Sequence, residues 1–131
     1  MIAGAKPWRA FGPVEPGRSY VALVTELRLT RWTALPSFGR HTAGSLRQLA
    51  RTPGVLGYAL RAAPHRRTFW TASVWEDEAA MAAYVRAQPH RDAMRWLRAS
   101  GAGTFRSSRW RVADAEVPLR WDAALARLTS D

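Results

Sequence analysis

Hydrophobic positions alternate with a period of two near the start of the chain. Over residues 20–29 one face carries Val21, Leu23, Leu27 and Leu29. This alternation predicts a β-strand, because successive side chains of a strand point to opposite faces. Short runs rich in aromatic and β-branched residues predict three further strands, at 55–60, 68–75 and 104–112.

Between these strands the apolar positions recur at helical spacing. The first predicted helix covers 34–51, with Phe38, Thr42, Leu46 and Leu49 on one stripe, and it stops at Thr52-Pro53-Gly54. A second helix begins at the acidic residues 76–78, which favour the positive end of a helix. Pro89 introduces a third helix at 90–100, and a last one is expected at 119–128.

The resulting order, β-α-β-β-α-(α)-β-(α), is the split βαβ arrangement of an α+β protein. We therefore predict a ferredoxin-like βαββαβ fold, with an antiparallel sheet and helices on one face. Residues 1–18 hold three prolines and three glycines and are expected to form an irregular lead-in to a single domain at 19–131. The second face of the sheet, with Tyr20 and Val24, remains apolar, so we predict a homodimer that pairs sheet to sheet.

Composition limits the classes of protein that fit. A chain of 131 residues that is 47% hydrophobic suits one folded domain. It has no cysteine, which excludes disulfides, thiolate metal sites and cysteine nucleophiles. The chain has no apolar run of about 18 residues, so no membrane span is predicted. The first 16 residues lack the apolar core of a signal peptide, so a cytoplasmic location is expected.

Arginine dominates the charge. The net charge is +10, and all but one of the 20 basic residues are arginine, the exception being Lys6. One interpretation is a surface for nucleic acid or another anion. The other is a compositional bias, because the arginines are spread along the chain and not gathered with aromatics. Arg91, Arg95 and Arg98 share one face of the third helix and are either an anion clamp or a solvated face.

Three stretches resemble a known superfamily, that of the antibiotic biosynthesis monooxygenases. They are the entry to the second strand at 52–58, the Trp-Glu-Asp-Glu end of the third strand at 75–78, and the Pro-His-Arg-x-x-Met helix start at 89–94. The last is similar to the domain-of-unknown-function family numbered 3291. The resemblance covers residues 20–128. It implies a dimeric α/β barrel that binds a small molecule without a cofactor, with haem as the alternative.

The resemblance also assigns candidate site residues. His90 is the expected catalytic residue, either a general base or a haem ligand, with a capping role as the alternative. Trp70 and Trp75 would wall a ligand pocket, unless they are plain core residues. The remaining ligand-binding candidates are Tyr58, Arg91 and Met94. No spacing of histidines and carboxylates predicts a metal site.

Three functions follow, in this order. The first is a monooxygenase-like enzyme acting on a small aromatic or polyketide-like molecule without a cofactor. The second is a haem or small-ligand binding protein without turnover. Haem-degrading members resemble one another through an Asn-Trp-His set, and this chain has no asparagine. The third is a nucleic-acid-binding module, which rests on charge alone, so nucleic acid is not the expected partner.

Overall fold

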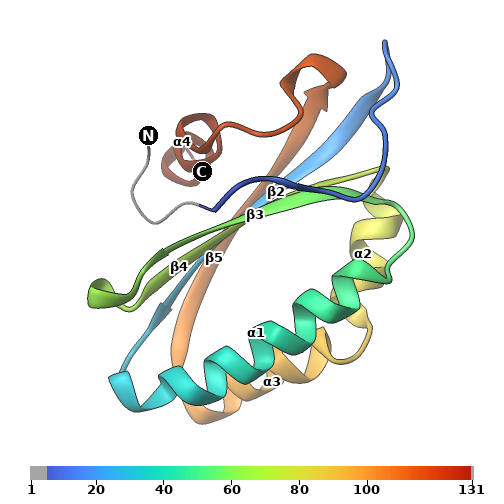
Figure 1. Ribbon diagram of the computed structural model, residues 1–131. Coiled ribbons are helices and arrows are strands. Elements are labelled where there is room, and N and C mark those ends of the chain that lie inside the picture. Colours follow the sequence, from blue (N-terminus) through green and yellow to red (C-terminus); the bar gives the residue numbers. More distant parts are fainter. Residues whose placement is uncertain (1–5, 131) are drawn as a thin grey trace.

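The protein is a strongly twisted antiparallel sheet with helices on both sides, in a computed structural model that describes residues 6–130 (Figure 1). The strands are β1 (Arg9–Ala10), β2 (Ser19–Leu29), β3 (Val55–Ala63), β4 (Thr68–Trp75) and β5 (Gly103–Ala113). The α-helices are α1 (Leu35–Ala50), α2 (Glu78–Arg86), α3 (His90–Ser100) and α4 (Trp121–Ser130). Short 3₁₀ turns lie at Trp32–Ala34, Pro64–Arg66 and Asp114–Glu116.

The strand order in the sheet is β1-β3-β4-β2-β5, and every neighbouring pair is antiparallel. β2 lies between β4 and β5, so that Val24 is opposite Ala72 on one side and Ser108 on the other. The path from β2 through α1, β3, β4, α2 and α3 to β5 is the predicted ferredoxin-like order. Within the described residues, no helix has both the length and the apolar composition that crossing a bilayer requires.

The helices between the strands, α1, α2 and α3, cover one face of the sheet, as predicted (Figure 1). Local sequence sets their ends. The Asp77 carboxylate accepts a hydrogen bond from the Ala80 backbone N–H at 2.8 Å, which caps α2. α3 ends where Gly101 takes a left-handed conformation, with φ of 63°.

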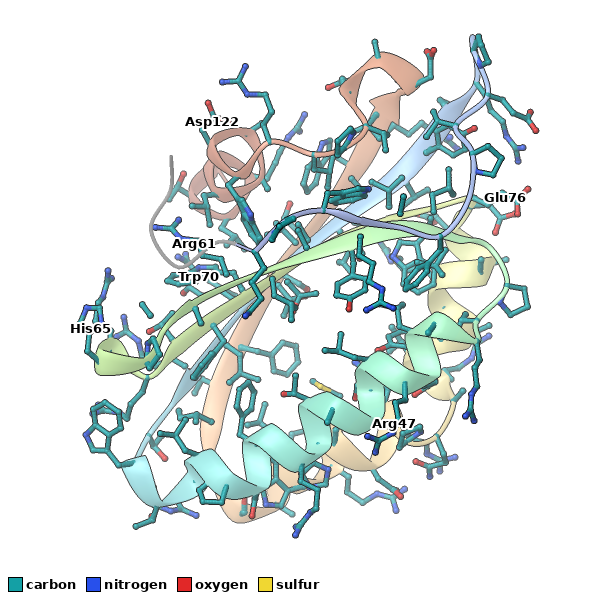
Figure 2. The ribbon with its side chains drawn as sticks, viewed as in Figure 1. Arg47, Arg61, His65, Trp70, Glu76 and Asp122 are labelled. Atoms are coloured by element: carbon teal, nitrogen blue, oxygen red, sulfur yellow. The ribbon has the colours of Figure 1, made fainter. Side chains whose placement is uncertain are left out.

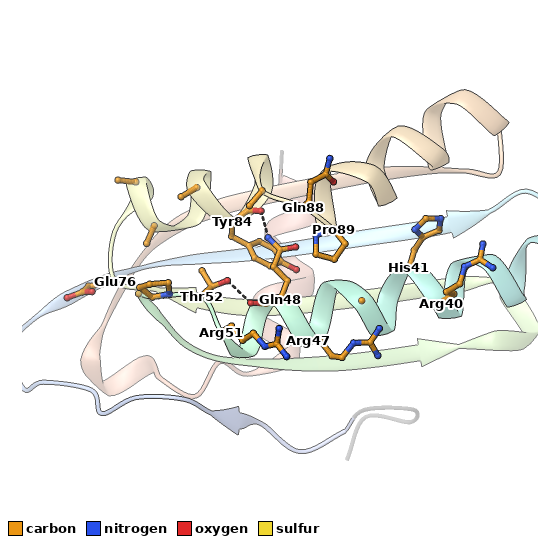
Figure 3. A pocket seen from close by; sticks show the side chains of 17 residues that line it. Arg40, His41, Arg47, Gln48, Arg51, Thr52, Glu76, Tyr84, Gln88 and Pro89 are labelled. Atoms are coloured by element: carbon orange, nitrogen blue, oxygen red, sulfur yellow. Dashed lines mark hydrogen bonds between the residues drawn. The ribbon is translucent and has the colours of Figure 1, made fainter.

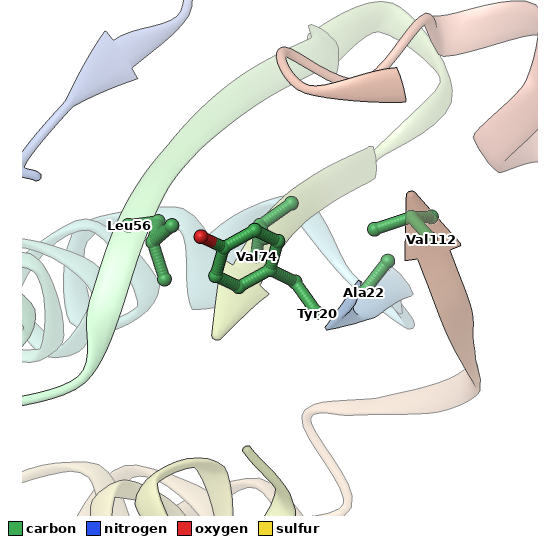
Figure 4. Packing of buried hydrophobic residues seen from close by; sticks show 5 residues of the cluster. All are labelled: Tyr20, Ala22, Leu56, Val74 and Val112. Atoms are coloured by element: carbon green, nitrogen blue, oxygen red, sulfur yellow. The ribbon is translucent and has the colours of Figure 1, made fainter. Parts of the chain in front are cut away.

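The opposite face is covered by α4 and by the N-terminal segment. Tyr20 and Ala22 on β2 pack there with Leu56, Val74 and Val112 (Figure 4). A neighbouring cluster sets Val24 and Trp70 against Ala124 and Leu128 of α4. The homodimer was predicted because this face needed a cover. Since the chain provides that cover itself, the structure removes this reason, and the dimer stays a prediction.

The lead-in and the element ends differ in detail from the sequence-based expectation. Residues 1–5 lie outside the described part, but Trp8 and Phe11 pack against the core and Arg9–Ala10 pairs with β3. β3 runs three residues beyond the predicted 55–60, because its ladder with β4 continues to the Ala63–Thr68 pair. α4 starts two residues later than predicted, after the 3₁₀ turn.

Gly54 offers a stability prediction at the entry to β3. Its φ is +88°, and a Cβ built there would lie 2.6 Å from the Cβ of Ala80. Gly54→Ala should therefore lower the free energy of unfolding by about 1–3 kcal/mol. The control is Gly39→Ala within α1, where a Cβ meets nothing within 4 Å and helix propensity predicts a gain of about 0.5–1 kcal/mol. Urea unfolding measures both, and equal effects would contradict the prediction.

Candidate functional site

A cavity of about 250 Å³ lies between the helix-covered face of the sheet and the helices α1 and α3. Its walls are predominantly apolar, with Leu23, Phe38, Phe69 and Met94 among them. The cavity explains why Leu23 and Thr71 remain partly exposed although they lie on inner strands of the sheet. An apolar enclosure with few polar groups is the usual form of a small-molecule site.

His90 borders this cavity as the first residue of α3. Its Nδ1 lies 3.3 Å from the carbonyl oxygen of Val85. A carbonyl oxygen only accepts, so Nδ1 carries the proton and Nε2 keeps a free lone pair. Burial lowers the pKa of His90 below the ordinary value of 6.5, and the Val85 hydrogen bond opposes this shift only in part. The imidazole is therefore neutral at physiological pH and able to accept a proton.

The imidazole packs against Tyr84, which in turn packs against Trp75. The ring centroid of Tyr84 lies 4.8 Å from the ring centroid of His90 and 5.3 Å from that of Trp75. Trp75 is 1% exposed, and its Nε1 donates to the Ser73 hydroxyl at 2.9 Å. Burial raises the pKa of Tyr84 to about 12, and its hydroxyl donates to the Ser45 carbonyl at 3.0 Å. Tyr84 is thus a neutral wall of the site, and His90 is the better proton acceptor.

Gln48 of α1 holds the junction between α2 and α3 in place. Its Nε2 donates to the Tyr84 carbonyl at 3.0 Å, and its Oε1 accepts the His90 backbone N–H at 2.8 Å. Figure 3 shows Gln48 reaching across from α1 to Tyr84, beside an open hollow of about 950 Å³ on the outside of the helix layer. One side chain therefore caps α3 and sets the position of its first residue, His90.

A second hollow opens on the other side of His90, between α2, α3 and β5. Its volume is about 1010 Å³, and it shares Leu23, Thr25, Tyr84, His90 and Met94 with the cavity. We call it the arginine groove, because its basic lining residues are Arg86, Arg91, Arg95, Arg98 and Arg109. His90 thus lies where an apolar enclosure meets a polar, open groove.

The structure brings together three of the predicted site residues, namely His90, Trp75 and Met94, around the cavity. Arg91 lies in the arginine groove. Tyr58 packs against Phe11 with ring centroids 5.6 Å apart and does not line the cavity.

Trp70 borders the cavity through its strand, but its ring packs on the opposite face of the sheet. There Trp70 Nε1 donates to Glu26 at 2.9 Å, and the Arg61 guanidinium lies 4.9 Å from the ring (Figure 2). Burial alone would raise the pKa of Glu26, but hydrogen bonds from Arg106 and Trp70 outweigh it, and the net shift is downward. This cluster holds the sheet and α4 together and is separate from the cavity.

Sequence reasoning missed Gln48 and the contact between Tyr84 and His90. A signal was present, because His41, Ser45 and Gln48 recur at helical spacing beside the apolar stripe of α1. All three border the cavity or the outer hollow. Polar residues at the edge of the apolar stripe of a helix can reach a neighbouring helix. The sequence pattern does not identify which helix they contact.

A family model for antibiotic biosynthesis monooxygenases matches residues 22–96, which is more than half of the chain. The chain belongs to the antibiotic biosynthesis monooxygenase family. The matched span runs from β2 into α3 and so includes the cavity, Gln48, Trp75 and His90. The narrower likeness to family 3291 stays a prediction. A search among curated proteins gave no match.

Solved structures of this family share the fold at low sequence identity. SnoaB, a cofactor-independent oxygenase from Streptomyces nogalater, is 21% identical with a TM-score of 0.59, over 76% of this chain and 97% of SnoaB. LmHde, a heme-degrading enzyme from Listeria monocytogenes, is 17% identical with a TM-score of 0.54, over 76% of this chain and 68% of LmHde. At such identities the likeness shows the architecture and not the reaction.

Haem and metal ions were tested against the residues present. The cavity of about 250 Å³ is smaller than the range of about 300–1,000 Å³ that drug-sized ligands occupy, and a porphyrin is larger still. The enclosed space alone is therefore smaller than a haem. Among residues 6–130, no group of three or more histidine and carboxylate side chains is placed to hold a metal ion.

The bonds of Gln48 give a second stability prediction. Gln48→Met keeps the length of the side chain but removes both hydrogen bonds to the α2–α3 junction. We expect the free energy of unfolding to fall by about 1–3 kcal/mol. Arg47→Met, at the exposed neighbouring position of α1, is the control and should change it by less than about 0.5 kcal/mol. Denaturant titration followed by circular dichroism measures both, and equal losses would mean that the Gln48 bonds contribute nothing.

Proposed function

We propose that the protein is a cofactor-independent oxygenase acting on a planar aromatic molecule with an activated C–H group. The observation that carries the proposal is the placement of His90. A neutral imidazole with a free Nε2 borders an apolar cavity walled by aromatic rings. A positioned base near its operating pH is an efficient general base, and an enclosed apolar site keeps water from the intermediates.

The chemistry needs no external reductant. His90 Nε2 takes a proton from a CH₂ group next to an aromatic ketone, and the carbanion passes one electron to O₂. The substrate radical and superoxide combine to form a C–O bond, and the proton on His90 returns to the terminal oxygen. Loss of the second C–H proton then breaks the O–O bond, leaving a C=O group and one molecule of water. The substrate loses four electrons, and O₂ gains four.

The test is oxygen uptake with anthrone, a tricyclic ketone with one activated CH₂ group. Wild-type protein should consume one O₂ for each anthrone and form anthraquinone faster than the buffer blank, in metal-free and haem-free solution. Tight binding of anthrone without uptake would instead indicate a ligand-binding protein. A Soret band of the purified or haem-titrated protein, together with no uptake, would indicate a haem protein. Either result contradicts the proposal.

The predicted homodimer is part of the same proposal and has its own test. One chain has a mass of 14.6 kDa. Light scattering after size exclusion should give twice that mass if two copies associate. A monomer would agree with the cover that α4 already provides over the second face of the sheet.

A further inference from the structure

The arginine groove adjoins the cavity. The two share five lining residues, and His90 and Met94 lie on the boundary between them. A flat molecule with its reacting ring at His90 therefore lies directly beside the groove. The groove is four times the volume of the cavity, about 1010 Å³ against about 250 Å³. The groove therefore has room for a part of the ligand that the cavity does not hold.

The charge of the groove has one sign. Its five charged lining residues are all arginines, three from α3, one from α2 and one from β5. Two of them form long ion pairs. Oδ1 of Asp92 lies 3.8 Å from a guanidinium nitrogen of Arg95, and Oε1 of Glu78 lies 3.6 Å from Nε of Arg109. Within the described part of the chain, no carboxylate lies in ion-pair range of Arg86, Arg91 or Arg98. Like charges held together cost free energy unless an anion joins them.

Apolar surface accompanies the arginines. Phe105 on β5 is 38% exposed and Val85 on α2 is 40% exposed, and both line the groove. The Arg98 guanidinium lies 5.9 Å from the centre of the Phe105 ring, which is within cation–π range. A solvated arginine face requires neither exposed apolar residues nor an adjoining cavity. Their combination suits a ligand with an aromatic body and an anionic end.

We propose that the arginine groove binds a carboxylate on the substrate, so that the enzyme selects aromatic ketones that carry an acid group at the end remote from the reacting carbon. This inference rests on the proposed function and names its substrate class. Arg91 and Arg98 are the primary contacts, since both are without a carboxylate partner and Arg91 directly follows His90. Arginine is suited to this role because its planar fork binds a carboxylate with two parallel hydrogen bonds.

The test compares anthraquinone-2-carboxylate with its methyl ester by isothermal titration calorimetry. The two probes share one ring system, differ in charge and undergo no oxidation. Wild-type protein should bind the acid about tenfold more tightly than the ester. Arg91→Gln/Arg98→Gln should abolish this preference. The control, Arg40→Gln/Arg47→Gln, removes the same charge from the outer hollow and should keep the preference.

Salt gives an independent measurement. The preference of the wild type for the acid should shrink as ionic strength rises from about 50 to about 500 mM, because exposed charges are screened. Equal affinities for acid and ester, or an equal loss of preference in the control, would overturn the inference. The inference would also be overturned if the Arg91→Gln/Arg98→Gln variant lost affinity for a short single-stranded oligonucleotide but kept its affinity for the acid.

The two proposals fail in different ways. Equal binding of acid and ester beside intact oxidation of anthrone contradicts the groove and leaves the oxygenase. A tenfold preference for the acid without oxygen uptake supports the groove and contradicts the oxygenase.

Discussion

Replacing His90 with glutamine is expected to lower the rate of anthrone oxidation by about 10²–10⁴-fold, the usual contribution of a positioned general base. Glutamine has a similar size, and its backbone N–H still reaches Gln48, so the fold of α3 should persist. What it lacks is an Nε2 lone pair that can take up a proton. Oxygen uptake at saturating anthrone, with circular dichroism to verify the fold, measures this loss.

The pH dependence of the wild type provides the signature of that base. Burial lowers the pKa of His90, so the imidazole becomes protonated only below the ordinary value of 6.5. The charged side chains that line the groove beside it are all arginines. Activity should therefore be level above pH 6.5 and fall in acid as His90 takes up a proton. His90→Gln should remove this acid limb along with the activity.

Two histidine variants make the assignment specific. His65→Gln changes an exposed turn at the tip of the β3–β4 hairpin, away from the helices (Figure 2), and should leave the rate and the acid limb unchanged. His41 also borders the cavity and stacks on Trp96 with ring centroids 4.8 Å apart. If His41→Gln, and not His90→Gln, removed the acid limb, His41 would be the base and the assignment made here would be wrong.

Removing the indole of Trp75 should have the largest effect on stability. Trp75→Ala deletes a side chain that is 1% exposed and leaves the Ser73 hydroxyl without its donor. The free energy of unfolding should fall by about 3–5 kcal/mol. That is a large part of the usual total of about 5–15 kcal/mol, so the variant is expected to be partly unfolded at 37 °C. Urea titration followed by far-ultraviolet circular dichroism measures the loss.

A milder variant keeps this prediction testable if the alanine variant does not fold. Trp75→Phe retains a ring beside Tyr84 but loses the N–H donor and part of the volume, and should cost about 1–3 kcal/mol. The control is Trp32→Ala, because Trp32 is 49% exposed, and the expected change is less than about 1 kcal/mol. Similar losses at Trp32 and Trp75 would show that the cavity wall does not contribute to the stability of the fold.

The sequence alone predicted the elements and their order. The period-two alternation at 20–29 and the helical stripe from Phe38 to Leu49 are local patterns, set by the geometry of one strand and one helix. The position of β2 between β4 and β5 follows from the ferredoxin-like order, so the sequence also predicts this part of the strand order. His90, Trp75 and Met94 were predicted as site residues through short motifs, because motif residues lie close together in the chain.

Tertiary structure decided the faces and the contacts over long range. Trp70 and Trp75 are both aromatic residues of β4, yet their odd separation of five places their side chains on opposite faces of the sheet. Only the packing of α4 shows that the chain itself covers the face that carries Trp70. The reach of Gln48 to Tyr84 and His90 spans 36 and 42 residues. Hydrogen bonds of that kind depend on the angle at which two helices pack, which no local pattern encodes. The neutral His90 between an apolar cavity and an arginine groove is therefore a product of the folded chain, although each residue was visible in the sequence.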